Sequence, residues 1–294
     1  MNEIVIISGK GGTGKTSITA SFSVLAGTRA IIADCDVDAA DMHLLLKPDF
    51  AQSEDFFSGF KADIDQKLCM KCGKCKQVCR FDAVRNDDNF YDIIPLNCEG
   101  CGYCKEVCPI NAITMVEQNV GKWYISKIKT DTFMVHAKLG IGADNSGKLV
   151  AQVKKEAKNL AQETKKEFVL VDGSPGIGCP VVSSISGADY VVLVTEPTLS
   201  GFHDMQRVHE LIQKFNLPSG CIINKYDVNN EITDSIITFC EKNSIDIISK
   251  LPYDESFTAA MMHGKTILEY KDNKINKILI KSWGKLLNSL NKKD

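Results

Sequence analysis

The chain has 294 residues, of which 44% are hydrophobic and 24% charged, and its formal net charge is −2. These values exclude an intrinsically disordered chain, and the small charge gives no support for electrostatic binding of nucleic acid. No apolar run approaches the roughly 18 residues of a membrane-spanning helix. The N-terminus leads directly into a strand and a loop, so we expect no signal peptide and a cytoplasmic protein.

The first part of the chain alternates between strand and helix patterns. Residues 3–7 form an apolar run typical of a buried parallel strand, residues 16–26 predict a helix, and residues 29–33 predict the next strand. From about residue 52 the sequence becomes polar and irregular. A block rich in cysteine then continues to about residue 116.

Strand and helix patterns resume after this block. Strands are predicted at 123–128, 132–137, 168–171, 190–195, 220–223 and 245–251, and helices at 148–164, 199–215, 231–243 and near the C-terminus. This alternation predicts an α/β fold with a mostly parallel sheet and helices on both faces. We assign residues 1–58 and 118–294 to this domain, and residues 59–117 to a small inserted α+β ferredoxin-like domain.

A phosphate-binding loop lies between the first predicted strand and the first helix. Its sequence, GKGGTGKT from Gly9 to Thr16, fits the pattern G-x4-G-K-[ST] in the strand–loop–helix context that the pattern requires. Lys15 is expected to contact the outer phosphates and Thr16 to ligate Mg²⁺. The nucleotide-binding candidates are Gly9, Gly11, Gly12, Thr13, Gly14, Lys15, Thr16 and Ser17.

The second lysine of this loop, Lys10, is not part of the general pattern. With it the loop resembles that of the MinD-like and Mrp-like ATPases, a family that includes the nitrogenase iron protein. The resemblance implies a P-loop NTPase that forms an ATP-dependent homodimer in which Lys10 reaches the partner's phosphates. It also implies ATP hydrolysis, with Lys10, Lys15, Asp36 and Asp172 as the catalytic residues. Because no Gln or Arg is obviously placed as a fast catalytic group, we expect slow hydrolysis that a partner accelerates.

Four further positions match the family pattern. Asp36 lies where the family has its first switch, near Mg²⁺ and the attacking water, and Asp172 matches the Walker B residue that holds Mg²⁺ through water. Gly176 matches a backbone donor to the γ-phosphate. Asn224 and Pro252 match positions beside the adenine base.

The cysteine block contains one spacing twice. Cys69, Cys72, Cys75 and Cys79 follow C-x2-C-x2-C-x3-C, and the pattern recurs 29 residues later at Cys98, Cys101, Cys104 and Cys108. This is the ligand spacing of ferredoxins with two 4Fe–4S clusters, in which the fourth cysteine of each run serves the other cluster. A zinc site is the alternative, but zinc sites usually separate two C-x2-C pairs by a longer loop.

We therefore expect Cys69, Cys72, Cys75 and Cys108 to hold one cluster, and Cys98, Cys101, Cys104 and Cys79 to hold the other. The repeat also aligns Phe81 with Ile110 and Val84 with Ile113, and these pairs are expected to pack together. The expected cofactors are thus ATP, Mg²⁺ and two 4Fe–4S clusters.

Four cysteines and one helix lie outside these motifs. Cys35, Cys221 and Cys240 are expected to be buried apolar residues, whereas Cys179 lies where the nitrogenase iron protein has a cluster ligand. A packed loop thiol is the favoured interpretation of Cys179. The C-terminal segment carries an apolar stripe flanked by lysines, which favours packing on the sheet over binding to a membrane surface.

Three functions agree with these motifs. ATP binding can gate electron transfer to or from a metalloprotein, or drive iron–sulfur or metallocofactor assembly. The alternative is a positioning or regulatory ATPase that uses the clusters as a redox sensor. In each case an ATP-responsive domain is coupled to the cysteine block.

Overall fold

The computed structural model describes residues 1–87, 90–140 and 145–291, which form two compact units. The first unit contains Met1–Glu54, Trp123–Leu139 and the chain from Ser146 onward. The second contains Asp55–Lys122 together with Gly140 and Asn145. The cysteine block thus lies in a unit of its own, whose bounds extend the predicted 59–117 by several residues on either side.

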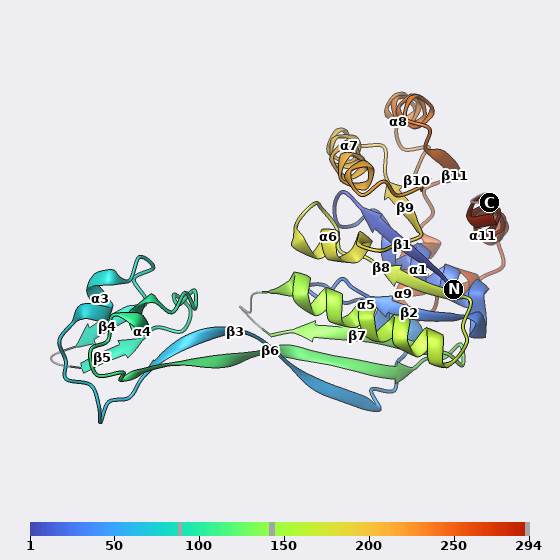
Figure 1. The fold of residues 1–294 in the computed structure, drawn as a ribbon. Coiled ribbons are helices and arrows are strands. Elements are labelled where there is room, and N and C mark those ends of the chain that lie inside the picture. Colours follow the sequence, from blue (N-terminus) through green and yellow to red (C-terminus); the bar gives the residue numbers. More distant parts are fainter. Residues whose placement is uncertain (88–89, 141–144, 292–294) are drawn as a thin grey trace. The chain divides into compact units, whose positions relative to one another are not determined.

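The central sheet has the strand order β11-β10-β9-β1-β8-β2-β7-β6-β3 (Figure 1). Its strands in the first unit are β1 (Asn2–Ser8), β2 (Ala30–Asp34), β7 (Phe133–Leu139), β8 (Phe168–Asp172), β9 (Tyr190–Thr195), β10 (Ser219–Asn224) and β11 (Asp246–Leu251). All of the pairings from β11 through to β7 are parallel. The predicted α/β fold with a mostly parallel sheet is confirmed.

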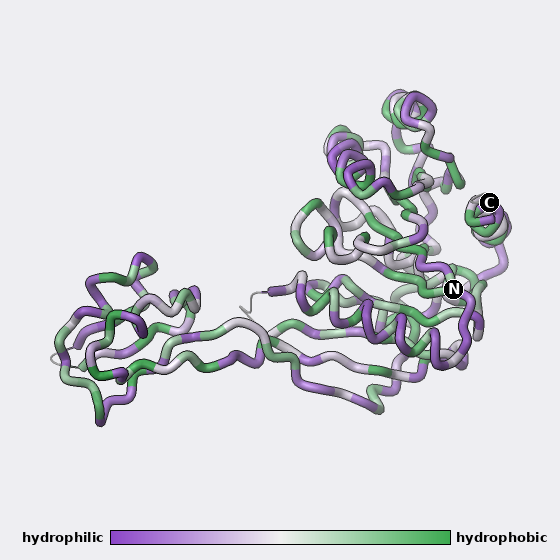
Figure 2. The backbone as a smooth tube through the Cα atoms, viewed as in Figure 1, coloured by the Kyte–Doolittle hydropathy of each residue, from purple (hydrophilic) through white to green (hydrophobic). Residues whose placement is uncertain are grey.

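Helices cover both faces of this sheet. Helices α1 (Lys15–Ala26), α2 (Met42–Leu46), α10 (Ile267–Tyr270) and α11 (Lys274–Leu290) share one apolar core with the strands. On the other face α5 (Ser146–Glu163), α6 (Cys179–Ile185) and α7 (Leu199–Lys214) contact the strands, and α8 (Asn230–Lys242) contacts β11. Figure 2 shows hydrophobic residues along the central strands, as expected of strands buried on both sides.

The apolar stripe of α11 is buried against this core. Its members Ile275, Leu279, Trp283, Leu286 and Leu290 are each no more than 7% exposed. The stripe therefore covers a face of the sheet, as expected. No helix within the described part of the chain has the length and apolar character needed to cross a membrane.

Two long strands extend from the first unit into the second. They are β3 (Gln52–Ile64), over which no strand was predicted, and β6 (Ile113–Lys127), of which only the end was predicted, as the strand at 123–128. Most side chains of β3 are exposed or half-buried, and Phe57 and Phe60 are 51% exposed. A strand with little burial lacks the apolar alternation by which strands are recognised.

The second unit consists of two structurally equivalent halves. Helices α3 (Lys74–Val78) and α4 (Tyr103–Glu106) follow matching glycines in the left-handed region, and β4 (Val84–Asp87) pairs antiparallel with β5 (Phe90–Ile93). The Asp65 N–H donates to the Ala112 carbonyl at 2.8 Å, and the Ile94 N–H donates to the Ala83 carbonyl at 2.7 Å. These two bonds are equivalent under the 29-residue repeat. The start of each half is therefore hydrogen-bonded to the end of the other half.

The core of this unit is also symmetric. Ile64 and Ile93 are equivalent under the repeat, as are Val84 and Ile113, and all four are buried in one cluster. Packing of Val84 and Ile113 is as expected. Phe81 and Ile110 were expected to join them but are 43% and 38% exposed. Each instead lines a cavity of the second unit, Ile110 one and Phe81 another.

Candidate functional site

The phosphate loop opens a cavity at the carboxyl edge of the sheet. The loop connects β1 to α1, and the cavity beside it has a volume of about 340 Å³. Its wall includes nine of the predicted residues, which are Gly11, Gly12, Thr13, Gly14, Lys15, Thr16, Ser17, Asp36 and Asn224. This edge is where parallel α/β sheets bind ligands.

Lys15 lies between two carboxylates in this cavity. Its ammonium is 3.0 Å from Asp172 Oδ1 and 3.3 Å from Asp36 Oδ2, and its side chain is 5% exposed. Burial by itself lowers the pKa of Lys15, but the charges of Asp172 and Asp36 outweigh it and raise that pKa. Lys15 is therefore held as a cation at the position expected to meet the outer phosphates.

Two threonines of α1 fix Asp172 at the end of β8. The hydroxyl of Thr16 donates to Asp172 Oδ2 at 2.7 Å, and that of Thr19 donates to Oδ1 at 3.0 Å. Hydroxyl and carboxylate oxygens are the protein ligands that suit Mg²⁺. Thr16, Asp36 and Asp172 thus fit the predicted magnesium site.

The strand-end carboxylates are strongly perturbed. Burial, followed by the charge of Asp172, raises the pKa of Asp34 well above its ordinary value. Burial also raises the pKa of Asp36, with the Lys15 ammonium acting in the opposite direction. Asp36 lines the nucleotide cavity and Asp34 lines a separate cavity of the same unit, and perturbed groups of this kind are typical of a functional site.

Lys10 is held within its own chain. Its ammonium is 2.8 Å from Glu196 Oε1 and also donates to the hydroxyls of Thr198 at 3.1 Å and Ser200 at 3.2 Å. Glu196 Oε2 is 2.7 Å from the ammonium of Lys225, which donates in turn to the Gly12 carbonyl at 3.3 Å. Sequence reasoning missed Glu196 and Lys225, although both lie just after strands at the edge that carries the loop.

Asn224 contacts the phosphate loop directly. Its side-chain amide donates to the Thr13 carbonyl at 2.8 Å. Gly14 has a φ of +90°, which strains any other residue, and an added Cβ would lie 2.5 Å from this amide and displace it. The cavity is also lined by Tyr253, in the segment predicted to lie beside the base, and by Phe257 and Met261, which sequence reasoning missed.

Five predicted residues lie outside the cavity wall that the described chain forms: Gly9, Lys10, Asp172, Gly176 and Pro252. Gly9 packs so closely on α7 that an added Cβ would be 2.6 Å from Asp204. Gly176 donates its N–H to the Ser8 carbonyl at 2.9 Å. Pro252 directly precedes the lining residue Tyr253.

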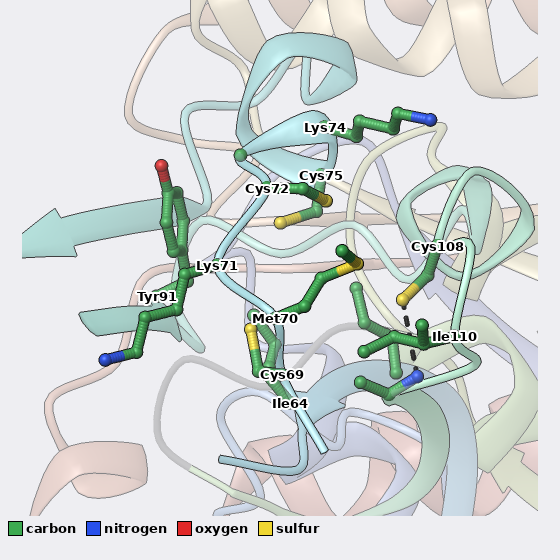
Figure 3. Close-up of a pocket in the computed structure, with 13 residues that line it drawn as sticks. Ile64, Cys69, Met70, Lys71, Cys72, Lys74, Cys75, Tyr91, Cys108 and Ile110 are labelled. Atoms are coloured by element: carbon green, nitrogen blue, oxygen red, sulfur yellow. Dashed lines mark hydrogen bonds between the residues drawn. The ribbon is translucent and has the colours of Figure 1, made fainter. Parts of the chain in front are cut away.

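The second unit contains two further cavities, each lined by four cysteines. Cys69, Cys72, Cys75 and Cys108 line the first, which Figure 3 shows in close-up. Cys79, Cys98, Cys101 and Cys104 line the second. The last cysteine of each run is thus grouped with the first three of the other run.

Equivalent backbone groups contact the two fourth cysteines. The Ala112 N–H donates to Cys108 Sγ at 3.3 Å, and the Ala83 N–H donates to Cys79 Sγ at 3.4 Å. Burial raises the pKa of the repeat-related thiols Cys75 and Cys104. Ligation of a metal there must displace a proton from each thiol.

The remaining cysteines differ in exposure. Cys35, Cys221 and Cys240 are buried, as expected, but Cys179 is exposed at the first turn of α6, contrary to the expected packed thiol.

Across residues 1–87, 90–140 and 145–291, no three His, Cys, Asp or Glu side chains are grouped for a single metal ion.

A family of nucleotide-binding domains matches residues 4–267, which is most of the chain. The chain belongs to the CobQ/CobB/MinD/ParA nucleotide-binding domain family. Its phosphate loop, Asp36 and Asp172 therefore lie in a domain of the kind that the loop sequence predicts.

Relatives of known sequence are similar over most of their length. An uncharacterized protein of Methanocaldococcus jannaschii is 35% identical over 230 residues, covering 78% of this chain and 79% of that protein. The septum site-determining protein MinD of Bacillus subtilis is 24% identical over 275 residues, covering 90% of this chain and 81% of its own.

Solved structures of MinD share the fold. MinD of Pyrococcus horikoshii in complex with Mg-ADP has a TM-score of 0.59 at 20% identity, covering 97% of this chain and 95% of that chain. MinD of Pyrococcus furiosus has a TM-score of 0.58 at 19% identity, covering 98% of this chain and 99% of that chain. At these identities the comparison shows that the fold is shared.

Proposed function

We propose that this member of the MinD/ParA group hydrolyses ATP and uses it to gate electron transfer through two 4Fe–4S clusters. The observation that carries the proposal is the pair of cysteine quartets, each gathered around its own cavity with one cysteine from the other run. Four cysteines around a space fit a cubane, in which each thiolate binds a different iron. The clusters would supply one-electron chemistry when bound.

The crossed ligand pattern favours electron transfer over cluster delivery. Each cavity takes cysteines from both halves of the unit, so each cluster would tie the two halves together. Release of a cluster to an acceptor would remove that tie. Resident clusters that carry electrons therefore suit this arrangement better than clusters in transit, and we propose a metalloprotein as the electron donor or acceptor.

The nucleotide cavity supplies the proposed switch. Lys15 and the loop amides would bind the phosphates. Thr16 and Asp36 would ligate Mg²⁺, and Asp172 would hold it through water. Gly176, whose N–H bonds the Ser8 carbonyl, would turn toward the γ-phosphate. Loss of that phosphate on hydrolysis would release the segments around Asp36 and Gly176.

We also propose an ATP-dependent homodimer in which Lys10 acts on the partner's nucleotide. The second lysine of the loop supports this assignment. In the single chain Glu196 neutralises Lys10, so dimerisation would exchange one anionic partner for another, the phosphates. We propose that the slow, partner-stimulated hydrolysis depends on this dimer, so a chain that does not dimerise should not show it.

Anaerobic purification tests the proposal. We expect about eight irons and eight sulfides per chain and a signal from reduced 4Fe–4S clusters in electron paramagnetic resonance. Lys15→Ala should abolish ATP turnover and keep the iron, whereas Cys72→Ala should lose iron and keep ATP binding. Wild-type protein with far less iron would refute the clusters. Iron that moves to an apo-acceptor on ATP hydrolysis would instead establish the assembly function.

A further inference from the structure

The two halves of the second unit share one backbone pattern but differ in charge. Residues 65–83 around the first cysteine run contain five basic and two acidic residues, whereas the equivalent residues 94–112 contain one basic and two acidic. The five basic residues are Lys67, Lys71, Lys74, Lys76 and Arg80, and all are exposed. None of them forms an ion pair with another residue that the structure describes.

Two of these lysines lie at the first cavity. Lys71 and Lys74 line it, and Figure 3 shows both side chains extending away from the cavity. Their equivalents in the second half are Gly100 and Tyr103, which carry no charge. Lys71 and Lys74 thus form a cationic rim at one edge of the cavity of Cys69, Cys72, Cys75 and Cys108, whereas no lysine or arginine that the structure describes lines the other cavity.

Two exposed apolar side chains lie next to this rim in the sequence. Met70 lines the first cavity and is 59% exposed, and Leu68 beside it is 57% exposed. Their equivalents in the second half are Glu99 and Asn97. The first half thus combines exposed apolar side chains with a charged border, which is the general anatomy of a protein interface.

We propose that this face, defined by Leu68, Met70, Lys71 and Lys74, is the docking surface for an acidic one-electron carrier protein. Complementary charge would bring the carrier's acidic patch onto the lysine rim and speed its encounter. Met70 would then separate the carrier from the first cavity. The purpose of this docking rests on the proposed function, but the docking itself is a property of these side chains.

The test measures binding of an acidic plant-type 2Fe–2S ferredoxin to the anaerobically purified full chain at low ionic strength. The double variant Lys71→Glu/Lys74→Glu should weaken association by about tenfold or more. Rising salt should weaken wild-type binding, since the Debye length falls from about 30 Å at 0.01 M to about 10 Å at 0.1 M.

A lysine of the second half provides a control. Lys74 and Lys105 are both exposed, so Lys74→Glu and Lys105→Glu make the same charge change at the proposed face and away from it. Weaker binding by Lys74→Glu alone supports the proposal. Equal loss in both variants, salt-independent binding, self-association at this face, or binding of anionic vesicles or DNA in place of ferredoxin overturns it.

Iron content separates this proposal from the proposed function. Lysine-dependent ferredoxin binding by a chain without iron–sulfur clusters would leave the docking surface standing and refute the clusters. A chain with both clusters that does not bind the ferredoxin would refute the docking surface alone.

Discussion

The carboxylate of Glu196 lies 2.8 Å from the ammonium of Lys10, the second lysine of the phosphate loop. The pair is largely shielded, with the Lys10 side chain 28% exposed and that of Glu196 13% exposed. Burial by itself raises the pKa of Glu196, but hydrogen bonds from Lys10 and Lys225 lower it overall. Glu196 thus stays ionised and holds Lys10 in its own chain, away from any partner.

Glu196→Gln should strengthen ATP-dependent dimerisation. The change removes the charge that competes with the partner's phosphates for Lys10. Such a pair contributes on the order of 0.2–1 kcal/mol, and forming the dimer breaks two of them, so association should strengthen by up to about thirtyfold. Sedimentation velocity with ATP measures the effect. Lys225→Met, which removes the other partner of Glu196, should bring no such gain. A weaker dimer in Glu196→Gln would show that this contact does not restrain Lys10.

Asp34→Asn should stabilise the nucleotide-free protein at neutral pH. Burial, then the charge of Asp172, raises the pKa of Asp34 well above its ordinary value, so the folded state binds this proton more tightly than the unfolded state. The raised pKa therefore costs stability at neutral pH, and the cost shrinks as pH falls below the raised pKa toward the ordinary value of about 3.9. Asparagine can still accept the 3.3 Å bond from the Asp36 N–H.

Urea unfolding between about pH 5 and pH 8 tests this prediction. The gain in unfolding free energy for Asp34→Asn should be largest at the upper end and shrink toward the lower end. Asp38→Asn, a change at an exposed neighbour, serves as the control. A gain that is constant with pH would show that Asp34 carries no excess charge cost.

The features predicted from sequence are those that rest on local pattern. The strand at 190–195 is found at those residues, because a strand buried on both faces is a continuous apolar run. The phosphate loop is recognised because its motif is a run of consecutive residues, from Gly9 to Thr16. Contacts made by folding were not predictable: Glu196 is 186 positions from Lys10 along the chain, and no spacing rule joins them. Helix α2 at Met42–Leu46 is too short to show a helical period.

Paired cysteine variants should reveal which cysteines share a cluster. If Cys79 completes the quartet of Cys98, either Cys79→Ala or Cys98→Ala should remove about four irons, and the double variant should lose no more. Cys79→Ala combined with Cys69→Ala should lose about eight, because Cys69 lines the other cavity. Iron analysis and the reduced-cluster signal give the readout. The reverse pattern, additive for Cys79 with Cys98 and non-additive with Cys69, would assign each run to a single cluster.

Trp283→Ala should destabilise the protein by about 3–5 kcal/mol. The indole is 6% exposed and lies 5.4 Å from the ring of Phe22 and 5.7 Å from that of Phe168, so its removal leaves a cavity between α11, α1 and β8. Ile280→Ala on the same helix, at a side chain that is 55% exposed, should change stability by less than about 0.5 kcal/mol.

Urea unfolding and flotation with anionic vesicles together decide the role of α11. A structural helix predicts a large loss of stability for Trp283→Ala, a negligible one for Ile280→Ala, and no vesicle binding by the wild type. A helix that inserts into a membrane surface predicts instead that the wild type floats with vesicles. In that case Trp283→Ala would reduce flotation while leaving the unfolding free energy nearly unchanged, because the indole would not be needed to cover the sheet.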